Sequence, residues 1–135
     1  MSINEEYYQV KEFHKAFNHP YSDKPTLIDM NLAQKRYDWM KEEIDEFLEA
    51  VENRDIYEQA DAMIDLIYFA LGTLVILGVT PAEVFKVVQD ANMSKLWEDG
   101  KPRFREGDGK VIKPPTWEDP HNKIVETINK MGYEK

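Results

Sequence analysis

The 135-residue sequence contains no cysteine. Disulfide bonds, a thiolate nucleophile and a thiolate metal site are therefore excluded, and we expect a cytoplasmic protein. Basic residues are also scarce, because 17 lysines and arginines stand against 26 acidic residues, giving a formal net charge of −9. A general nucleic-acid-binding protein would carry a basic face, so we expect no nucleic-acid partner.

The start of the chain, MSINEEYYQV, has neither the basic residues nor the apolar run of a signal peptide. One long apolar run is present, from Ala62 to Leu77, and Asp65 is its single charged residue. The run approaches the length of a transmembrane helix. Its acidic flanks and the lack of flanking lysine or arginine favour a buried helix of a globular protein, so we expect no membrane partner.

Apolar residues recur at spacings of three and four, which predicts an all-α protein. Capping signals and glycine stops set the expected helices: one ending near Phe17, then Thr26 to about Glu52, Asp55 to Gly78, Thr80 to about Asn92, and Asp119 to Gly132. Short connections make neighbouring helices antiparallel. We therefore expect a single domain over residues 1–135, an antiparallel helical bundle of about four main helices plus a short C-terminal helix. Residues 1–97 form the bundle, and residues 98–135 a basic loop, with a possible hairpin at 101–112, and the last helix.

The second expected helix has two covered faces. One is a core stripe of apolar residues: Tyr37, Met40, Ile44, Phe47, Leu48 and Val51. The other carries Leu32, Arg36, Trp39, Glu43, Glu46 and Ala50, while Glu42 and Asp45 point towards solvent. The third helix has more apolar surface than its neighbours can cover, which predicts a homodimer or homotetramer.

Acidic residues interrupt the apolar third helix. At 100° per residue, Glu58, Asp61 and Asp65 fall within about 60° of one another, so they form one stripe. Buried carboxylates cost several kcal/mol each unless they are protonated, paired or bound to a metal. Two helices that present such stripes to each other can hold hard divalent cations, which prefer oxygen ligands. The sequence therefore predicts a Mg²⁺ site, with Mn²⁺ as a possible substitute.

The sequence contains a complete EExxE motif, formed by Glu42, Glu43 and Glu46, and also the segments Asp65-Leu-Ile-Tyr68, Asn92-Met93-Ser94-Lys95 and Gly109–Pro114. In this combination the chain resembles the all-α nucleoside triphosphate pyrophosphohydrolase superfamily, the MazG-like group, and within it the phosphoribosyl-ATP pyrophosphohydrolase-like branch. The second acidic motif departs from the pattern, because Ala62 stands three residues before Asp65. Asp61 is one substitute, and Glu58 paired with Asp61 is the alternative; both remain open.

The resemblance implies metal ligation by Glu43, Glu46, Asp61 and Asp65, with Glu42 as a secondary ligand or water-orienting base. Glu42, Glu43, Glu46 and Asp65 are the candidate catalytic residues. In the family, water attacks the α-phosphorus of a nucleoside triphosphate and gives a monophosphate and pyrophosphate. Metal ions neutralise the phosphates and lower the pKa of water.

The only clearly basic stretch runs from Lys95 to Lys113, and we expect it to close over the phosphates. The candidate substrate-binding residues are Arg36, Trp39, Tyr68, Asn92, Lys95, Lys110 and Lys113. His14 is expected to be an exposed helix histidine, although it could line a base pocket. The sequence does not name the nucleotide. Alternatives are a phosphoribosyl-ATP substrate and a non-catalytic helical assembly or metal-binding module.

Overall fold

The computed structural model describes residues 2–134, and it confirms an all-α fold. The five helices are α1 (Asn4–Ala16), α2 (Met30–Glu52), α3 (Ile56–Leu77), α4 (Pro81–Met93) and α5 (His121–Lys130). In this part of the chain the only β-type pairing outside the helices is one antiparallel bridge between Phe104 and Val111. The expected hairpin at 101–112 is thus reduced to a single bridge.

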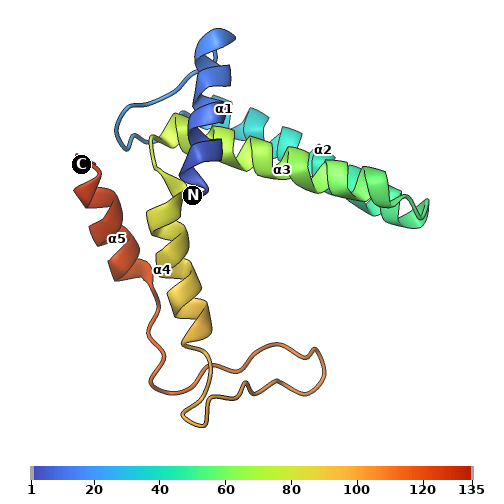
Figure 1. The fold of residues 1–135 in the computed structure, drawn as a ribbon, viewed down its shortest axis with the longest axis vertical. Helices are drawn as coiled ribbons and strands as arrows, with labels where there is room; N and C mark the ends of the chain where they lie inside the picture. The colour runs from blue at the N-terminus through green and yellow to red at the C-terminus, as the bar shows by residue number, and fades with distance from the viewer. Residues whose placement is uncertain (1, 135) are drawn as a thin grey trace.

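The helices form two arms (Figure 1). The α2 and α3 helices lie side by side as one arm, and α4 and α5 run away from that pair as the other. The α1 helix packs on α3 and contacts α4 near its own N-terminal end. The buried core lies where α1 crosses the C-terminal half of α3, and it consists of Tyr7, Val10, Leu71 and Val75.

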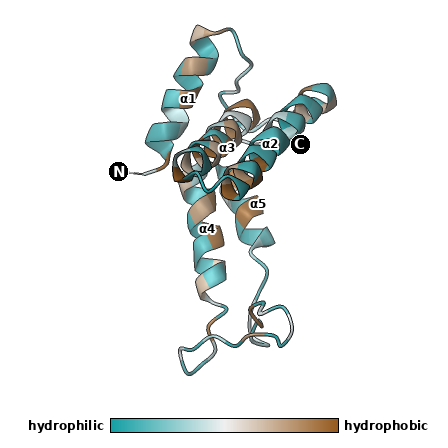
Figure 2. Cartoon of the chain, turned by 90° about the vertical axis from the view of Figure 1, so that its right-hand side faces the viewer, coloured by the Kyte–Doolittle hydropathy of each residue, from teal (hydrophilic) through white to brown (hydrophobic). Residues whose placement is uncertain are grey.

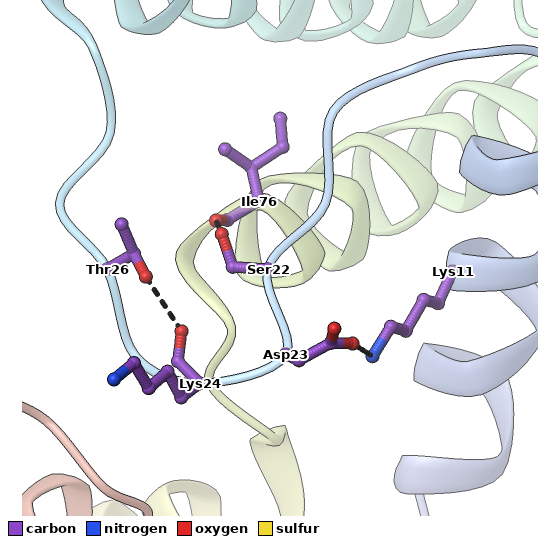
Figure 3. Close-up of polar contacts among 6 residues, drawn as sticks. All are labelled: Lys11, Ser22, Asp23, Lys24, Thr26 and Ile76. Atoms are coloured by element: carbon purple, nitrogen blue, oxygen red, sulfur yellow. Dashed lines mark hydrogen bonds and ion pairs between the residues drawn. The ribbon is translucent and has the colours of Figure 1, made fainter.

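The loop between α1 and α2 closes the end of α3 (Figure 3). The last carbonyl groups of a helix have no partner within the helix and need donors from elsewhere. Ser22 supplies two, because its backbone N–H donates to Val75 O at 3.0 Å and its hydroxyl to Ile76 O at 2.5 Å. The Thr26 N–H donates to Leu77 O at 2.8 Å. The loop is therefore an integral part of the helix terminus.

Gly78 permits the close approach of that loop. It has a φ of 67°, a left-handed conformation, and a Cβ there would lie 2.2 Å from Lys24 O. An ion pair between Lys11 Nζ and Asp23 Oδ1, at 2.9 Å, ties the loop to α1 (Figure 3). Gly78, which was expected to end the helix, is thus also required for the packing of the loop against α3.

Local capping signals located most helix ends correctly. The Asp55 carboxylate accepts hydrogen bonds from the N–H groups of Tyr57 and Glu58, as expected, and Pro81 opens α4. The expected cap of α2 was wrong, because the helix begins at Met30 and its cap is Asp29. Thr26 instead belongs to the loop before the helix, where its N–H donates to Leu77 O at the end of α3.

The start of α4 receives a cap from a distant residue. The Ala82 N–H donates to Asn4 Oδ1 at 2.9 Å, and Asn4 Nδ2 donates to Glu83 Oε1 at 2.9 Å. The Thr80 hydroxyl donates to the other oxygen of Glu83 at 2.5 Å. These contacts fix the angle between α1 and α4.

The prediction that the apolar stripe of α2 lies in the core is wrong for the single chain. Ile44 and Leu48 are 52% and 58% exposed, and the buried residues of α2 are Arg36 and Ala50. The helix turns its polar-looking stripe towards α3, so its apolar stripe is uncovered in the single chain.

The α3 helix is likewise only partly covered. By length and composition it could cross a membrane, and 28% of its most apolar 18-residue window is buried. The hydrophobic residues of α3 and α4 come together where the two helices meet (Figure 2). They line an open apolar groove of about 360 Å³.

Candidate active site

The hairpin of α2 and α3 brings the two acidic clusters face to face. Arg54 adopts a left-handed φ of 56°, and the Asp55 N–H donates to Ala50 O, so the chain reverses within three residues. This reversal places Glu43 and Glu46 of α2 opposite Asp65 of α3. The expected pairing of the two carboxylate stripes is therefore present in the structure.

Glu43 is the most perturbed carboxylate of the cluster. Burial, a hydrogen bond to Glu46 and the charges of Glu46, Asp65 and Asp61 raise the pKa of Glu43 to about 7. Its Oε2 is buried and has no hydrogen-bond partner. Burial, Asp61 and Glu46 also raise the pKa of Asp65. Each group raises the pKa of another because negative charges are close together without a compensating cation.

This donor set fits a hard divalent cation. Carboxylate oxygens are the ligands that Mg²⁺ and Mn²⁺ prefer, and an orphaned buried oxygen gains a partner when a cation binds. Within residues 2–134, no three acidic or histidine side chains already surround a single point. The acids instead extend along two facing helices. Glu42 is exposed beside the cluster.

A second hollow lies next to this cluster, towards the hairpin turn. It measures about 210 Å³, and Glu46, Glu49 and Glu58 line it. The charge of Asp61 raises the pKa of Glu43 and of Asp65. Glu58 lines the same hollow as Glu46. The second acidic motif can therefore still be Asp61 with Asp65 or Glu58 with Asp61.

Two aromatic residues adjoin the carboxylates, one helical turn away. Trp39 precedes Glu43 by four residues, and Phe69 follows Asp65 by four, and their ring centroids are 6.0 Å apart. Trp39 is 39% exposed. Tyr68, which is 42% exposed, contacts the ring of Phe13 with centroids 5.7 Å apart. Flat apolar faces therefore lie beside the acidic cluster.

Arg36 is buried against α3 and does not point at the acids. Its Nε donates to Thr73 Oγ1 at 2.8 Å and its Nη2 to Phe69 O at 3.1 Å. The guanidinium lies 5.8 Å from the Trp39 ring centroid and 5.6 Å from that of Phe69. Arg36 therefore links the Trp39–Phe69 pair to α3 and does not extend towards the carboxylates.

His14 is another correction, because it is 2% exposed and not on the surface. Its Nδ1 is 2.7 Å from Pro20 O. A carbonyl oxygen can only accept, so Nδ1 carries the proton. The packing of α1 across α3 buries this residue, and the spacing of residues within α1 could not reveal that contact.

The basic stretch lies at the far end of the other arm (Figure 1). Asn92 is exposed near the end of α4, and Lys110 and Lys113 are exposed in the segment that follows. Within one chain, the structure does not bring these residues to the carboxylates. Two residues missed by sequence reasoning are Trp97 and Trp117, whose rings contact the basic side chains of this stretch.

The family described as phosphoribosyl-ATP pyrophosphohydrolase matches residues 10–92. Among solved structures 24 chains match. One is a candidate NTP pyrophosphohydrolase from Exiguobacterium sp. 255-15, which is 32% identical, with 92% of this chain and 94% of that chain covered and a TM-score of 0.53. No curated protein matches.

Proposed function

Because the chain belongs to the phosphoribosyl-ATP pyrophosphohydrolase family, we propose that it hydrolyses the α–β phosphoanhydride of a nucleoside triphosphate, with Mg²⁺ as cofactor. The products are a nucleoside monophosphate and pyrophosphate. The observation that carries this proposal is Glu43, whose buried oxygen lacks a partner and whose pKa is raised to about 7 by burial and neighbouring acids. Such a cluster is stable as an ionised set only when it binds a cation.

Glu43, Glu46, Asp61 and Asp65 would hold the cation, which supplies charge neutralisation and a more acidic water when bound. Glu42 is exposed next to them and would orient water or act as a secondary ligand. Like charges on two facing helices repel, and a cation held by these residues would offset that repulsion.

Nucleotide binding would use the partly exposed rings beside the acids. Trp39 and Tyr68 present flat faces for a base, and Arg36 holds Trp39 in place through the cation–π contact. Asn92, Lys95, Lys110 and Lys113 would bind the phosphates. Because they lie on the other arm of the same chain, this role requires movement of that arm or a second copy of the protein.

A homodimer or homotetramer is part of the proposal. The accessible surface of the chain is 10199 Å². A compact monomer of 15.9 kDa exposes about 7,400 Å². The extended segment after α4 contributes to this difference, and so do the uncovered apolar faces of α2 and α3. A standard interface removes about 800 Å² from each partner, so the surface can accommodate one.

A phosphoribosyl-ATP substrate is the second candidate, and the description of the matching family favours it. The bond cleaved is the same, so the carboxylate cluster serves both candidates equally. Only the ring contacts and the space for an added ribosyl phosphate distinguish them.

The test is a substrate screen with the purified protein, Mg²⁺ and Mn²⁺. It includes common and modified nucleoside and deoxynucleoside triphosphates and phosphoribosyl-ATP. Monophosphate with pyrophosphate as products supports the proposal, whereas orthophosphate with a diphosphate refutes it. Release of no product from any substrate would instead favour a non-catalytic helical module.

A further inference from the structure

The cations of the segment after α4 rest on two indole rings. Lys95 Nζ lies 5.8 Å from the centroid of the Trp117 ring, and Lys113 Nζ lies 4.4 Å from the same centroid. The guanidinium of Arg103 lies 3.9 Å from the Trp97 ring. The face of an indole ring attracts a cation, and an indole does so more strongly than other aromatic side chains. Two lysines that are far apart in the sequence therefore share one ring.

Trp117 is itself held in place by hydrogen bonds. Its indole N–H donates to Ala91 O at 2.8 Å, in the last turns of α4, and its backbone N–H donates to Pro114 O at 3.0 Å. Pro114 is buried and the Trp117 side chain is half-buried. The ring thus fastens the extended chain that carries Lys113 to the helix end that leads into Lys95.

The two ammonium groups lack acidic partners. None of the ion pairs among the described residues includes Lys95 or Lys113. By contrast, Arg105 of the same segment is paired with Asp108. Both ammonium groups lie near the same ring centroid, at 5.8 Å and 4.4 Å, and an anion with several charged oxygens supplies the negative partners that they lack.

We propose that Trp117 is a positioning residue for phosphate binding, which gathers Lys95 and Lys113 into one pair at the end of α4. The inference rests on the proposed function, since it concerns how the same enzyme would bind the phosphates of its substrate. Trp117 acts through the lysines and does not touch the phosphates. Without the ring, each lysine is a free surface side chain that loses conformational freedom when it binds.

Trp97 provides a matched control in the same segment. Its indole N–H donates to Ile112 O at 3.0 Å, so it also joins two parts of the segment. Its ring holds Arg103 and neither lysine. Loss of either tryptophan removes one ring and one hydrogen bond, but only loss of Trp117 separates Lys95 from Lys113.

The experiment compares Trp117→Leu, Trp117→Phe and Trp97→Leu in the full chain. Calorimetry measures the affinity for pyrophosphate in the presence of Mg²⁺, and steady-state kinetics measures KM and kcat for the best substrate of the screen. For Trp117→Leu, we expect pyrophosphate affinity to fall about tenfold and KM to rise about as much, with kcat changed less than about threefold. Trp117→Phe should retain part of the affinity, and Trp97→Leu should stay within about twofold of the wild type.

A double-mutant cycle separates positioning from a general structural role. Lys113→Ala should weaken pyrophosphate binding in the wild-type background but change it by less than about twofold when Trp117 is already leucine. Fully additive losses would overturn the inference, as would equal losses in Trp97→Leu and Trp117→Leu. Circular dichroism of each variant confirms that the helices remain.

The binding readout keeps this inference distinct from the proposed function. If the screen finds no substrate, the proposed hydrolysis fails, and the pyrophosphate titrations still decide the role of Trp117. If the wild type hydrolyses a nucleotide but Trp117→Leu binds pyrophosphate as the wild type does, the inference about Trp117 fails alone. A wild type that binds no pyrophosphate also overturns it.

Discussion

The guanidinium of Arg36 occupies the space that a side chain on Gly72 would fill. A Cβ on Gly72 would lie 2.6 Å from Arg36 Nη2 and 2.9 Å from His14 Nε2. The absent side chain therefore lets α1 and α2 bring two nitrogen-bearing groups against the C-terminal half of α3. Through Arg36, this notch also supports the ring of Trp39 beside the acidic cluster.

Gly72→Ala should destabilise the protein. Helix propensity alone would make alanine more stable by about 1 kcal/mol. Here the new methyl group collides with two buried side chains, and overpacking costs about 1–3 kcal/mol, so we expect a net loss of up to about 2 kcal/mol. Chemical denaturation followed by circular dichroism measures it. The reverse change at an exposed position of the same helix, Ala70→Gly, measures the difference in helix propensity between the two residues. A Gly72→Ala protein that is more stable than the wild type would contradict the prediction.

Removal of a proposed metal ligand should abolish activity without unfolding the metal-free protein. We expect Glu46→Gln and Asp65→Asn to lower turnover by about 100-fold or more. Because the cluster is self-repelling, the metal-free variants should be as stable as the wild type or more stable, by about 1 kcal/mol. Asp45→Asn is the control, since Asp45 is exposed on the same helix. Full turnover in Glu46→Gln and Asp65→Asn would place the site elsewhere.

The uncovered apolar stripe of α2 should be an interface between copies of the chain. Light scattering should give a mass above the 15.9 kDa of one chain. Leu48→Glu places a charge in the stripe and should shift the protein towards monomers. Leu27→Glu is the control, because Leu27 is 79% exposed in the loop before α2. A wild type that is monomeric at micromolar concentration would disprove the proposed oligomer.

The contribution of His14 to stability should fall as the pH drops below the ordinary pKa of histidine, about 6.5, whereas the raised pKa of Glu43 acts in the opposite direction in this range. Burial, and then the nearby charges of Arg36 and His19, lower the pKa of His14, despite the hydrogen bond to Pro20. The unfolded chain therefore takes up a proton before the folded protein does, and this contribution is lost from about pH 6.5 down to the lower pKa of the folded state.

Denaturation at a series of pH values measures this loss. In His14→Gln, the glutamine amide can still donate to Pro20 O, and the loss should be smaller than in the wild type across that range. His19, His121 and the acidic residues remain in both proteins, so the difference between them isolates His14. Parallel stability curves would contradict the prediction.

Helix positions were predictable because the signals that set them act within a few residues. Asp55 caps α3 through groups two and three residues away, and Pro81 opens α4 through its own ring. The exception supports the rule: Thr26 was expected to cap α2, but its N–H is bonded to Leu77, a residue far away in the chain. A contact of that kind leaves no local signal.

The facing of the two acidic stripes was predictable in part for the same reason. The spacing of Glu43 and Glu46 on one helix and of Asp61 and Asp65 on the next already put each pair on one face, and the short turn at Arg54 made the faces meet. The raised pKa of Glu43 follows from that meeting and from burial, which the spacing does not contain.

Burial depends on which neighbouring helix covers each face of a helix, and the periodicity of the sequence does not contain that information. Periodicity identified two stripes on α2, yet the structure packs the one with Arg36 on α3 and leaves the one with Leu48 exposed. His14 is buried because α1 crosses α3 at Gly72, where a missing side chain makes room. Hydrogen-bond caps act between near neighbours in sequence, whereas coverage of a face depends on the positions of whole helices, and those are set by contacts between residues far apart in the chain.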